Sequence, residues 1–69
     1  MGERINAKVL LLYGDQAELT TEHRGPEDPE RAPVARLVAD TGIPRARLVG
    51  AELVAVIGDD GHLERFERR

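Results

Sequence analysis

An almost unbroken apolar run from Leu48 to Ile57, followed at once by the turn sequence Gly58-Asp59-Asp60-Gly61, most constrains how this chain can fold. Aspartate followed by glycine between apolar segments is a strong β-hairpin signal, because both residues tolerate the backbone angles of a tight turn. The pattern predicts a hairpin over residues 48–67. A bulge near its turn would place Leu63 and Phe66 on one face, and a short C-terminal helix is the alternative.

A short amphipathic helix is predicted directly before this hairpin, over residues 33–41. Gly42 is a suitable left-handed stop for it. Arg36 and Asp40 lie four residues apart on its outer side, where they can form an ion pair. Four residues recur at the spacing of a buried helical stripe: Val34, Leu37, Val38 and Thr41.

The first third of the chain predicts another hairpin, over residues 5–24. Residues 7–13 form a short apolar run with both faces apolar, and Gly14-Asp15 supplies a turn. The return segment alternates, with one face formed by Ala17, Leu19, Thr21 and His23. This period of two is typical of a strand with one buried face. Three prolines and several charges then predict a proline-rich loop over residues 24–33.

These elements predict one small α+β domain over residues 1–69, with the order ββαββ and one helix packed on one face of a mostly antiparallel sheet. The first and third strands are apolar on both faces, but one short helix covers only one face. The other face therefore needs a partner, which predicts a homodimer or a tight contact with another protein. The candidate interface residues are Val9, Leu11, Val54 and Val56.

Composition narrows the class of protein further. The chain has no cysteine, and His23 and His62 are not at zinc-ligand spacing, so we expect neither disulfides nor a metal site or other cofactor. No apolar segment approaches the roughly 20 residues that span a membrane, and Val9–Leu12 is too short for a signal peptide. We therefore expect a cytoplasmic protein without membrane contact. The arginine, alanine, valine and glycine bias is typical of a GC-rich bacterial genome.

Few residues suit catalysis. The chain has no serine or cysteine, so no familiar nucleophile–histidine arrangement can be assembled. Asp59 and Asp60 are typical turn residues, and His23 is expected to be an ordinary histidine on a strand. These features favour a non-enzymatic role. One alternative is an oligomeric small-molecule binder or enzyme, with a pocket between subunits lined by His23, Tyr13 or the Asp59-Asp60 turn.

Residues 37–48 resemble the generic bacterial helix-turn-helix motif, with Gly42 as the turn glycine and residues 58–61 as a wing. That resemblance implies a DNA-binding protein in which Arg45 and Arg47 contact phosphate or guanine. The second helix would, however, expose Val49 to the groove, and the net charge of −3 opposes binding to phosphates. The sequence therefore favours a non-catalytic interaction or regulatory domain that acts through protein–protein contact and self-association, with winged-helix-like DNA binding as an alternative.

Overall fold

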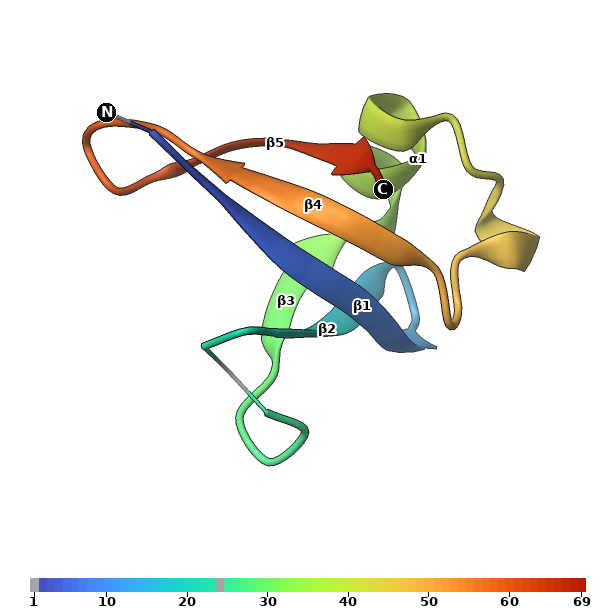
Figure 1. Cartoon of the computed structure of the whole chain (residues 1–69). Helices are drawn as coiled ribbons and strands as arrows, with labels where there is room; N and C mark the ends of the chain where they lie inside the picture. The colour runs from blue at the N-terminus through green and yellow to red at the C-terminus, as the bar shows by residue number, and fades with distance from the viewer. Residues whose placement is uncertain (1, 24) are drawn as a thin grey trace.

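Five antiparallel strands form one curled sheet in the computed structural model, which describes residues 2–23 and 25–69 (Figure 1). Within these residues the strand order is β3-β2-β1-β4-β5, with β1 in the middle. The elements are β1 (Glu3–Tyr13), β2 (Gln16–Thr21), β3 (Glu30–Pro33), α1 (Val34–Thr41), the 3₁₀ helix η1 (Arg45–Arg47), β4 (Glu52–Ile57) and β5 (Leu63–Arg68).

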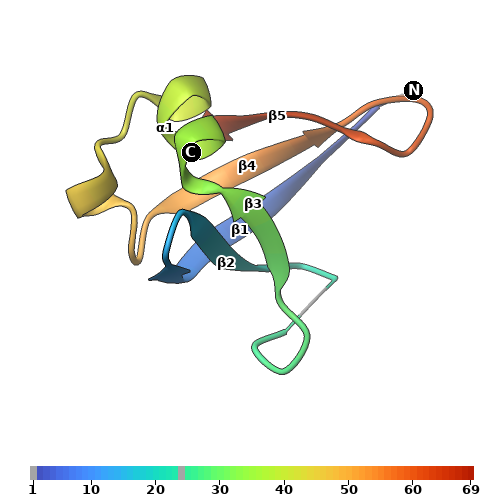
Figure 2. The same cartoon turned by 180° about the vertical axis from the view of Figure 1, so that it is seen from behind.

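The central strand β1 pairs with two partners and contains a bulge in its pairing with β2. Residues 3–8 run antiparallel to β4, and residues 7–13 run antiparallel to β2. The register with β2 shifts between Val9 and Leu11, which leaves Leu10 as an extra residue. A bulge of this kind bends a strand and increases its twist. The sheet curls accordingly, and its two edge strands β3 and β5 both reach the helix α1 (Figure 2).

The inner face of the curled sheet carries the core, which is aliphatic apart from Phe66. The alternation of side chains along each strand supplies this face, and the bulge in β1 returns Leu12 to it. Leu48 lies in the turn between η1 and β4 instead of in a strand, because β4 begins only at Glu52. The largest fully buried side chains are Val9, Leu19, Leu37, Leu48 and Leu53.

Helix α1 lies at one end of the sheet, against the edge strands β5 and β3 (Figures 1 and 2). It ends at Gly42, whose φ of 74° is left-handed and whose N–H donates to the Val38 carbonyl oxygen at 2.8 Å. The buried Thr41 hydroxyl donates to the Leu37 carbonyl oxygen at 2.6 Å and accepts from the Ile43 N–H at 3.2 Å. Across residues 2–23 and 25–69, no helix has the length and apolar character needed to cross a membrane.

The α+β class is confirmed, but the predicted order ββαββ omits one strand. Residues 30–33 form β3 and pair with β2 from Gln16 to Leu19, so three strands precede the helix. The predicted loop over residues 24–33 was therefore wrong in its last part, and residue 24 lies outside the described residues. The error has a physical cause: β3 is held by pairing with β2 across the intervening loop, and Pro29 before it and Pro33 at its end obscure any local strand signal.

The second hairpin contains the bulge that the spacing of Leu63 and Phe66 requires. In the pairing of β4 with β5, Val56 faces Arg65 whereas Ile57 faces Leu63, so Glu64 is the extra residue. Both Leu63 and Phe66 consequently contribute to the core on the inner face. The C-terminal segment is thus a strand, and the helical alternative for it was wrong.

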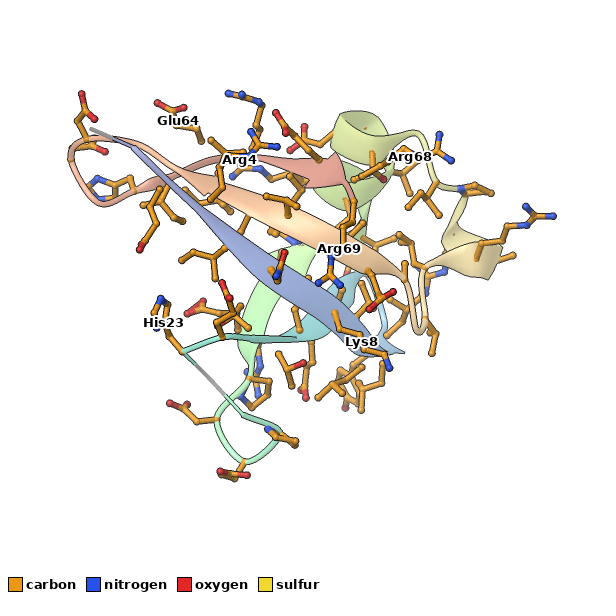
Figure 3. All side chains as sticks on the ribbon, viewed as in Figure 1. Arg4, Lys8, His23, Glu64, Arg68 and Arg69 are labelled. Carbon is orange, nitrogen blue, oxygen red and sulfur yellow. The ribbon has the colours of Figure 1, made fainter. Side chains whose placement is uncertain are left out.

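The outer face of the sheet is covered in part by the chain's own charged side chains. Val56 is only 8% exposed, and its neighbours in the adjacent strands are Arg4 and Arg65. Both arginines bind the Glu67 carboxylate, Arg65 through Nε at 2.8 Å. Long arginine stems can cover apolar surface while their charged ends stay in water. Figure 3 shows Arg4 among the charged side chains that project from the sheet.

Candidate functional site

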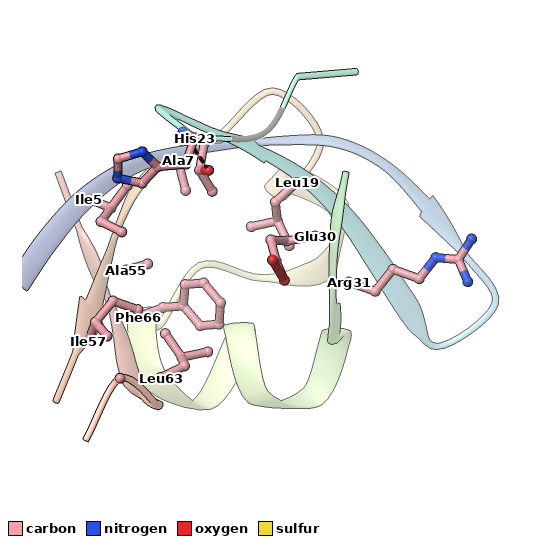
Figure 4. A pocket seen from close by; sticks show the side chains of 12 residues that line it. Ile5, Ala7, Leu19, His23, Glu30, Arg31, Ala55, Ile57, Leu63 and Phe66 are labelled. Atoms are coloured by element: carbon pink, nitrogen blue, oxygen red, sulfur yellow. Dashed lines mark hydrogen bonds between the residues drawn. The ribbon is translucent and has the colours of Figure 1, made fainter. Parts of the chain in front are cut away.

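A cleft of about 260 Å³ opens on the inner face of the sheet, between β5 on one side and β2 and β3 on the other (Figure 4). It exists because no pairing joins the edge strands β3 and β5 in the described part of the chain. Small residues leave the space: Ala55 lies between Ile5 and Phe66 on adjacent strands. The apolar lining comprises Ile5, Ala7, Leu19, Ala55, Ile57, Leu63 and Phe66.

Polar side chains are confined to the side of the cleft formed by β2 and β3. His23 follows β2, and its backbone N–H donates to the Thr21 hydroxyl at 3.1 Å. No hydrogen bond or ion pair of the His23 imidazole is present among the described residues. Arg31 pairs with Glu18 at 3.6 Å and is 73% exposed, so its guanidinium points away from the cleft (Figure 4). The imidazole of His23 is therefore available to a molecule in the cleft.

The outer edge of β5, beside the cleft, is covered by two side chains of α1. The Phe66 N–H donates to Asp40 Oδ2 at 3.0 Å, and Arg36 Nη2 donates to the Glu64 carbonyl oxygen at 2.7 Å. Arg36 Nε and Asp40 Oδ2 are 3.5 Å apart. The ion pair predicted from the sequence is present, but its contact with β5 was missed, because only the tertiary structure brings α1 to this strand. The pair occupies hydrogen-bonding groups that a neighbouring strand would otherwise use.

A second surface, which we call the apolar end, consists of Leu11, Tyr13 and Val49. Their exposed fractions are 43%, 79% and 58%, and they are the large hydrophobic residues that the described chain leaves exposed. Two backbone hydrogen bonds tie the Val49 segment to β1: Gly50 N–H donates to the Val9 carbonyl oxygen at 2.8 Å, and Val9 N–H donates to the Ala51 carbonyl oxygen at 3.0 Å. The three side chains therefore belong to one end of the molecule.

The four candidate interface residues have different environments. Val9 has no exposed surface and belongs to the core, whereas Leu11 is exposed at the apolar end. Val54 is half-buried and Val56 is buried on the outer face of β4. The sequence did not indicate Val49 as a surface residue of this kind, because its position beside β1 depends on the turn after η1.

The two arginines of the helix-turn-helix interpretation lie in η1, a single turn of three residues. Arg45 Nη2 donates to the Gly14 carbonyl oxygen at 2.6 Å, which joins η1 to the first hairpin turn. Between Gly42 and β4, the described chain forms no second α-helix. The segment with Arg45 and Arg47 thus lacks the recognition helix that this mode of DNA binding requires.

Asp59 and Asp60 lie in a tight turn in the structure, as the sequence predicts. The Gly61 N–H donates to the Gly58 carbonyl oxygen at 3.0 Å, and Asp60 Oδ1 accepts from the His62 N–H at 3.0 Å. Hydrogen bonds from the backbone and then the side chain of His62 hold the pKa of Asp60 below its usual range. Within residues 2–23 and 25–69, no group of three or more His, Cys, Asp or Glu side chains is arranged to hold a metal ion.

Comparison of the chain with protein-family models, with curated proteins and with solved structures found no match. The candidate sites are therefore defined by the geometry of this chain alone. Every buried side-chain nitrogen and oxygen in the described residues has a hydrogen-bond partner. The candidate sites are the cleft and the apolar end.

Proposed function

We propose that this chain is a non-catalytic interaction domain that acts through protein–protein contact and associates with a second copy through the apolar end. One observation carries the proposal: the large hydrophobic side chains left exposed in the described residues, Leu11, Tyr13 and Val49, lie at the same end of the molecule. Scattered exposed hydrophobic residues are ordinary, whereas a contiguous group marks an interaction surface.

The residue types suit an interface. Tyrosine is enriched at protein–protein contacts because its ring is large and apolar while its hydroxyl remains able to bind water or a polar partner. Tyr13 is the most exposed of the three residues. Leu11 and Val49 add aliphatic side chains beside it, which can pack against the same side chains of a second copy. A twofold arrangement therefore brings the same three residues together from both chains.

The backbone near the apolar end favours a preorganised surface. The bulge in β1 turns Leu11 and Tyr13 to the outer face, and the Val9–Gly50 hydrogen bond fixes the turn that carries Val49. Binding through a surface already held in place loses less conformational entropy than ordering a loop during association. Self-association also suits a domain of this size, because small single cores supply little stability.

Sedimentation velocity across the micromolar range tests the proposal. The wild-type chain is expected to sediment increasingly as a dimer as concentration rises, and Leu11→Asp is expected to remain monomeric because a carboxylate would be buried at the contact. Ala35→Asp is the matched control, since it introduces the same charge on the exposed side of α1. Circular dichroism of all three proteins checks that the fold is retained.

Two results would contradict the proposal. One is a wild-type chain that stays monomeric throughout the micromolar range. The other is a dimer that Leu11→Asp and Ala35→Asp weaken equally, since this would place the contact away from the apolar end.

Nucleic-acid binding is the principal alternative from another class. Some five-stranded, partly open sheets, such as the OB-fold, bind oligonucleotides on the face of strands 2 and 3, but this is an analogy of architecture alone. In this chain Glu18 lies on the outward side of β2 and the exposed Glu22 follows the strand directly, and both would repel phosphates. Salt-dependent binding to an oligonucleotide, weakened by Arg45→Ala or Arg47→Ala, would favour this alternative over protein contact.

A further inference from the structure

We propose that the cleft between β5 and the β2–β3 side of the sheet binds a small aromatic molecule that carries one hydrogen-bonding group. Phe66 and its aliphatic neighbours would hold the ring, and the His23 imidazole would bind the polar group. The cleft lies on the inner face, whereas Leu11 and Tyr13 of the apolar end lie on the outer side of β1. The inference is thus independent of self-association.

The size of the cleft sets the size of the molecule. A buried apolar cavity of about 150 Å³ is large enough to bind benzene. The cleft measures about 260 Å³, which by the same proportion suits a molecule of about ten non-hydrogen atoms. Its lining is mostly apolar, and a few polar groups at one side are typical of small-molecule sites.

The lining also favours an aromatic body. Phe66 is 5% exposed, and its ring projects into the space between β5 and β2 (Figure 4). A second ring placed against it at an edge-to-face or offset angle gains more than area burial alone. Leu19 and Ile5 supply flat aliphatic contacts on the other sides of the cleft.

The polar group of the ligand is expected to bind His23. A neutral imidazole offers one donor and one acceptor nitrogen, so it can accept a hydrogen bond from a ring N–H or a phenolic O–H. Two charged residues also belong to this wall: Arg31 pairs with Glu18 outside the cleft, and the Glu30 side chain lines the cleft beside Leu19 (Figure 4). In this inference the hydrogen bond to His23 orients the ligand, and its apolar body supplies most of the affinity.

An extended peptide fits this cleft less well than a small molecule. Strand addition needs free backbone groups along an edge strand. On β5, the groups of Glu64 and Phe66 that face away from β4 are already bound by Arg36 and Asp40. On the opposite side β3 has only four residues, and its last, Pro33, has no N–H. We therefore expect the bound molecule to contact the cleft through its ring and its polar group, and not through the backbone hydrogen bonds that an added strand would make.

Titration of the ¹⁵N-labelled full chain with indole, followed by amide chemical shifts, tests the inference. Indole is expected to shift the amides of Leu19, Ala55 and Phe66, with a dissociation constant of roughly 0.1–1 mM for a molecule of this size. Ala55→Leu fills the cleft and is expected to abolish the shifts. Ala39→Leu adds the same atoms on the exposed side of α1 and is the matched control. Ile57→Phe replaces Ala55→Leu if the latter does not fold.

The role of His23 is tested with a pair of ligands. Indene has the shape of indole without its N–H, so it is expected to bind about fivefold more weakly to the wild-type chain. In His23→Leu this difference is expected to vanish, since the imidazole nitrogen that accepts the indole N–H is removed. His23 is exposed, so the substitution leaves the core intact.

Several results would overturn the inference. These are the absence of indole-dependent shifts at millimolar concentration, shifts confined to Leu11 and Val49, unchanged binding by Ala55→Leu or by its substitute, and equal binding of indole and indene to the wild-type chain. A capped Gly-Phe-Gly peptide that binds the cleft more tightly than indole would assign it to a peptide instead. None of these results depends on whether the chain dimerises.

Discussion

Asp40→Ala is expected to loosen the contact between α1 and the edge strand β5. In the native chain, Asp40 Oδ2 accepts the Phe66 N–H at 3.0 Å and lies 3.5 Å from Arg36 Nε. Truncation removes the acceptor from an amide in a residue that is only 5% exposed. It also leaves Arg36 with the Glu64 carbonyl oxygen as its remaining partner at this contact.

The magnitude follows from these contacts. A hydrogen bond to a charged group contributes about 1.5–3 kcal/mol when buried, and an exposed ion pair contributes about 0.3–0.5 kcal/mol. The Asp40 side chain is 24% exposed, so water replaces part of the lost bond. We expect a loss of about 1.5 kcal/mol in the free energy of unfolding. For a domain of this length, that corresponds to a decrease in Tm of roughly 6–12 °C.

Urea unfolding followed by circular dichroism measures the loss, and hydrogen exchange of the Phe66 amide locates it. Glu27→Ala, which truncates an exposed loop carboxylate, is the control and is expected to change stability by less than about 0.5 kcal/mol. In Asp40→Ala, the Phe66 amide should exchange faster relative to the Leu53 amide than in the wild type. Equal stability of the two variants, with unchanged exchange at Phe66, would refute the proposed protection of β5 by α1.

Three further predictions concern stability. Leu37→Ala, at a position with no exposed surface, should lower the free energy of unfolding by about 3 kcal/mol in urea titration; a loss below about 1 kcal/mol would place Leu37 outside the core. Gly42→Ala should lower Tm because φ is 74° there, although the added Cβ meets no atom within 4 Å; the backbone cost is about 1 kcal/mol, and an unchanged Tm would contradict the left-handed stop. Arg4 and then Arg65 hold the pKa of Glu67 below its usual range, so the unfolded chain takes up a proton first as pH falls. Stability should therefore be complete above about pH 5 and decrease below it, and this decrease should be smaller in Glu67→Gln.

The local elements of this fold could be predicted from the sequence because the residues that indicate each element lie close together in the chain. The helix end at Gly42 needs only a glycine that adopts a positive φ after an amphipathic stripe. The alternation from Ala17 to His23 was enough to place these residues on one side of β2, and Thr21 and His23 indeed line the cleft with Leu19. The bulge before Phe66 was predicted because Leu63 and Phe66 would fall on opposite faces of a regular strand.

The features that sequence reasoning missed depend on contacts between distant residues. β3 is four residues long and exists because it pairs with β2, which no local pattern reveals. The curl of the sheet arises at the Leu10 bulge, and it buries Val9 without a second protein. One helix would leave an apolar face of a flat sheet uncovered, whereas this curled sheet encloses much of its own inner face.

The candidate sites were only partly accessible for the same reason. His23 was expected on the inner side of its strand, but the space beside it required the pairing of Ala55 between Ile5 and Phe66. Leu11 was a candidate interface residue, whereas its grouping with Val49 required the hydrogen bonds between Val9 and the Gly50 turn. Such surfaces combine residues that lie about 40 positions apart in the chain, whereas hydrophobic periodicity relates only residues within one helix or strand.

Contact between two copies through the apolar end can be observed by an isotope-filtered NOESY experiment on mixed labelled and unlabelled chains. We expect intermolecular NOEs from the methyl groups of Leu11 and Val49 and from the Tyr13 ring, with none from the core residue Leu53. Intermolecular NOEs centred on Leu63 and Ile57 at the cleft, or none under conditions where the chain sediments as a dimer, would contradict it.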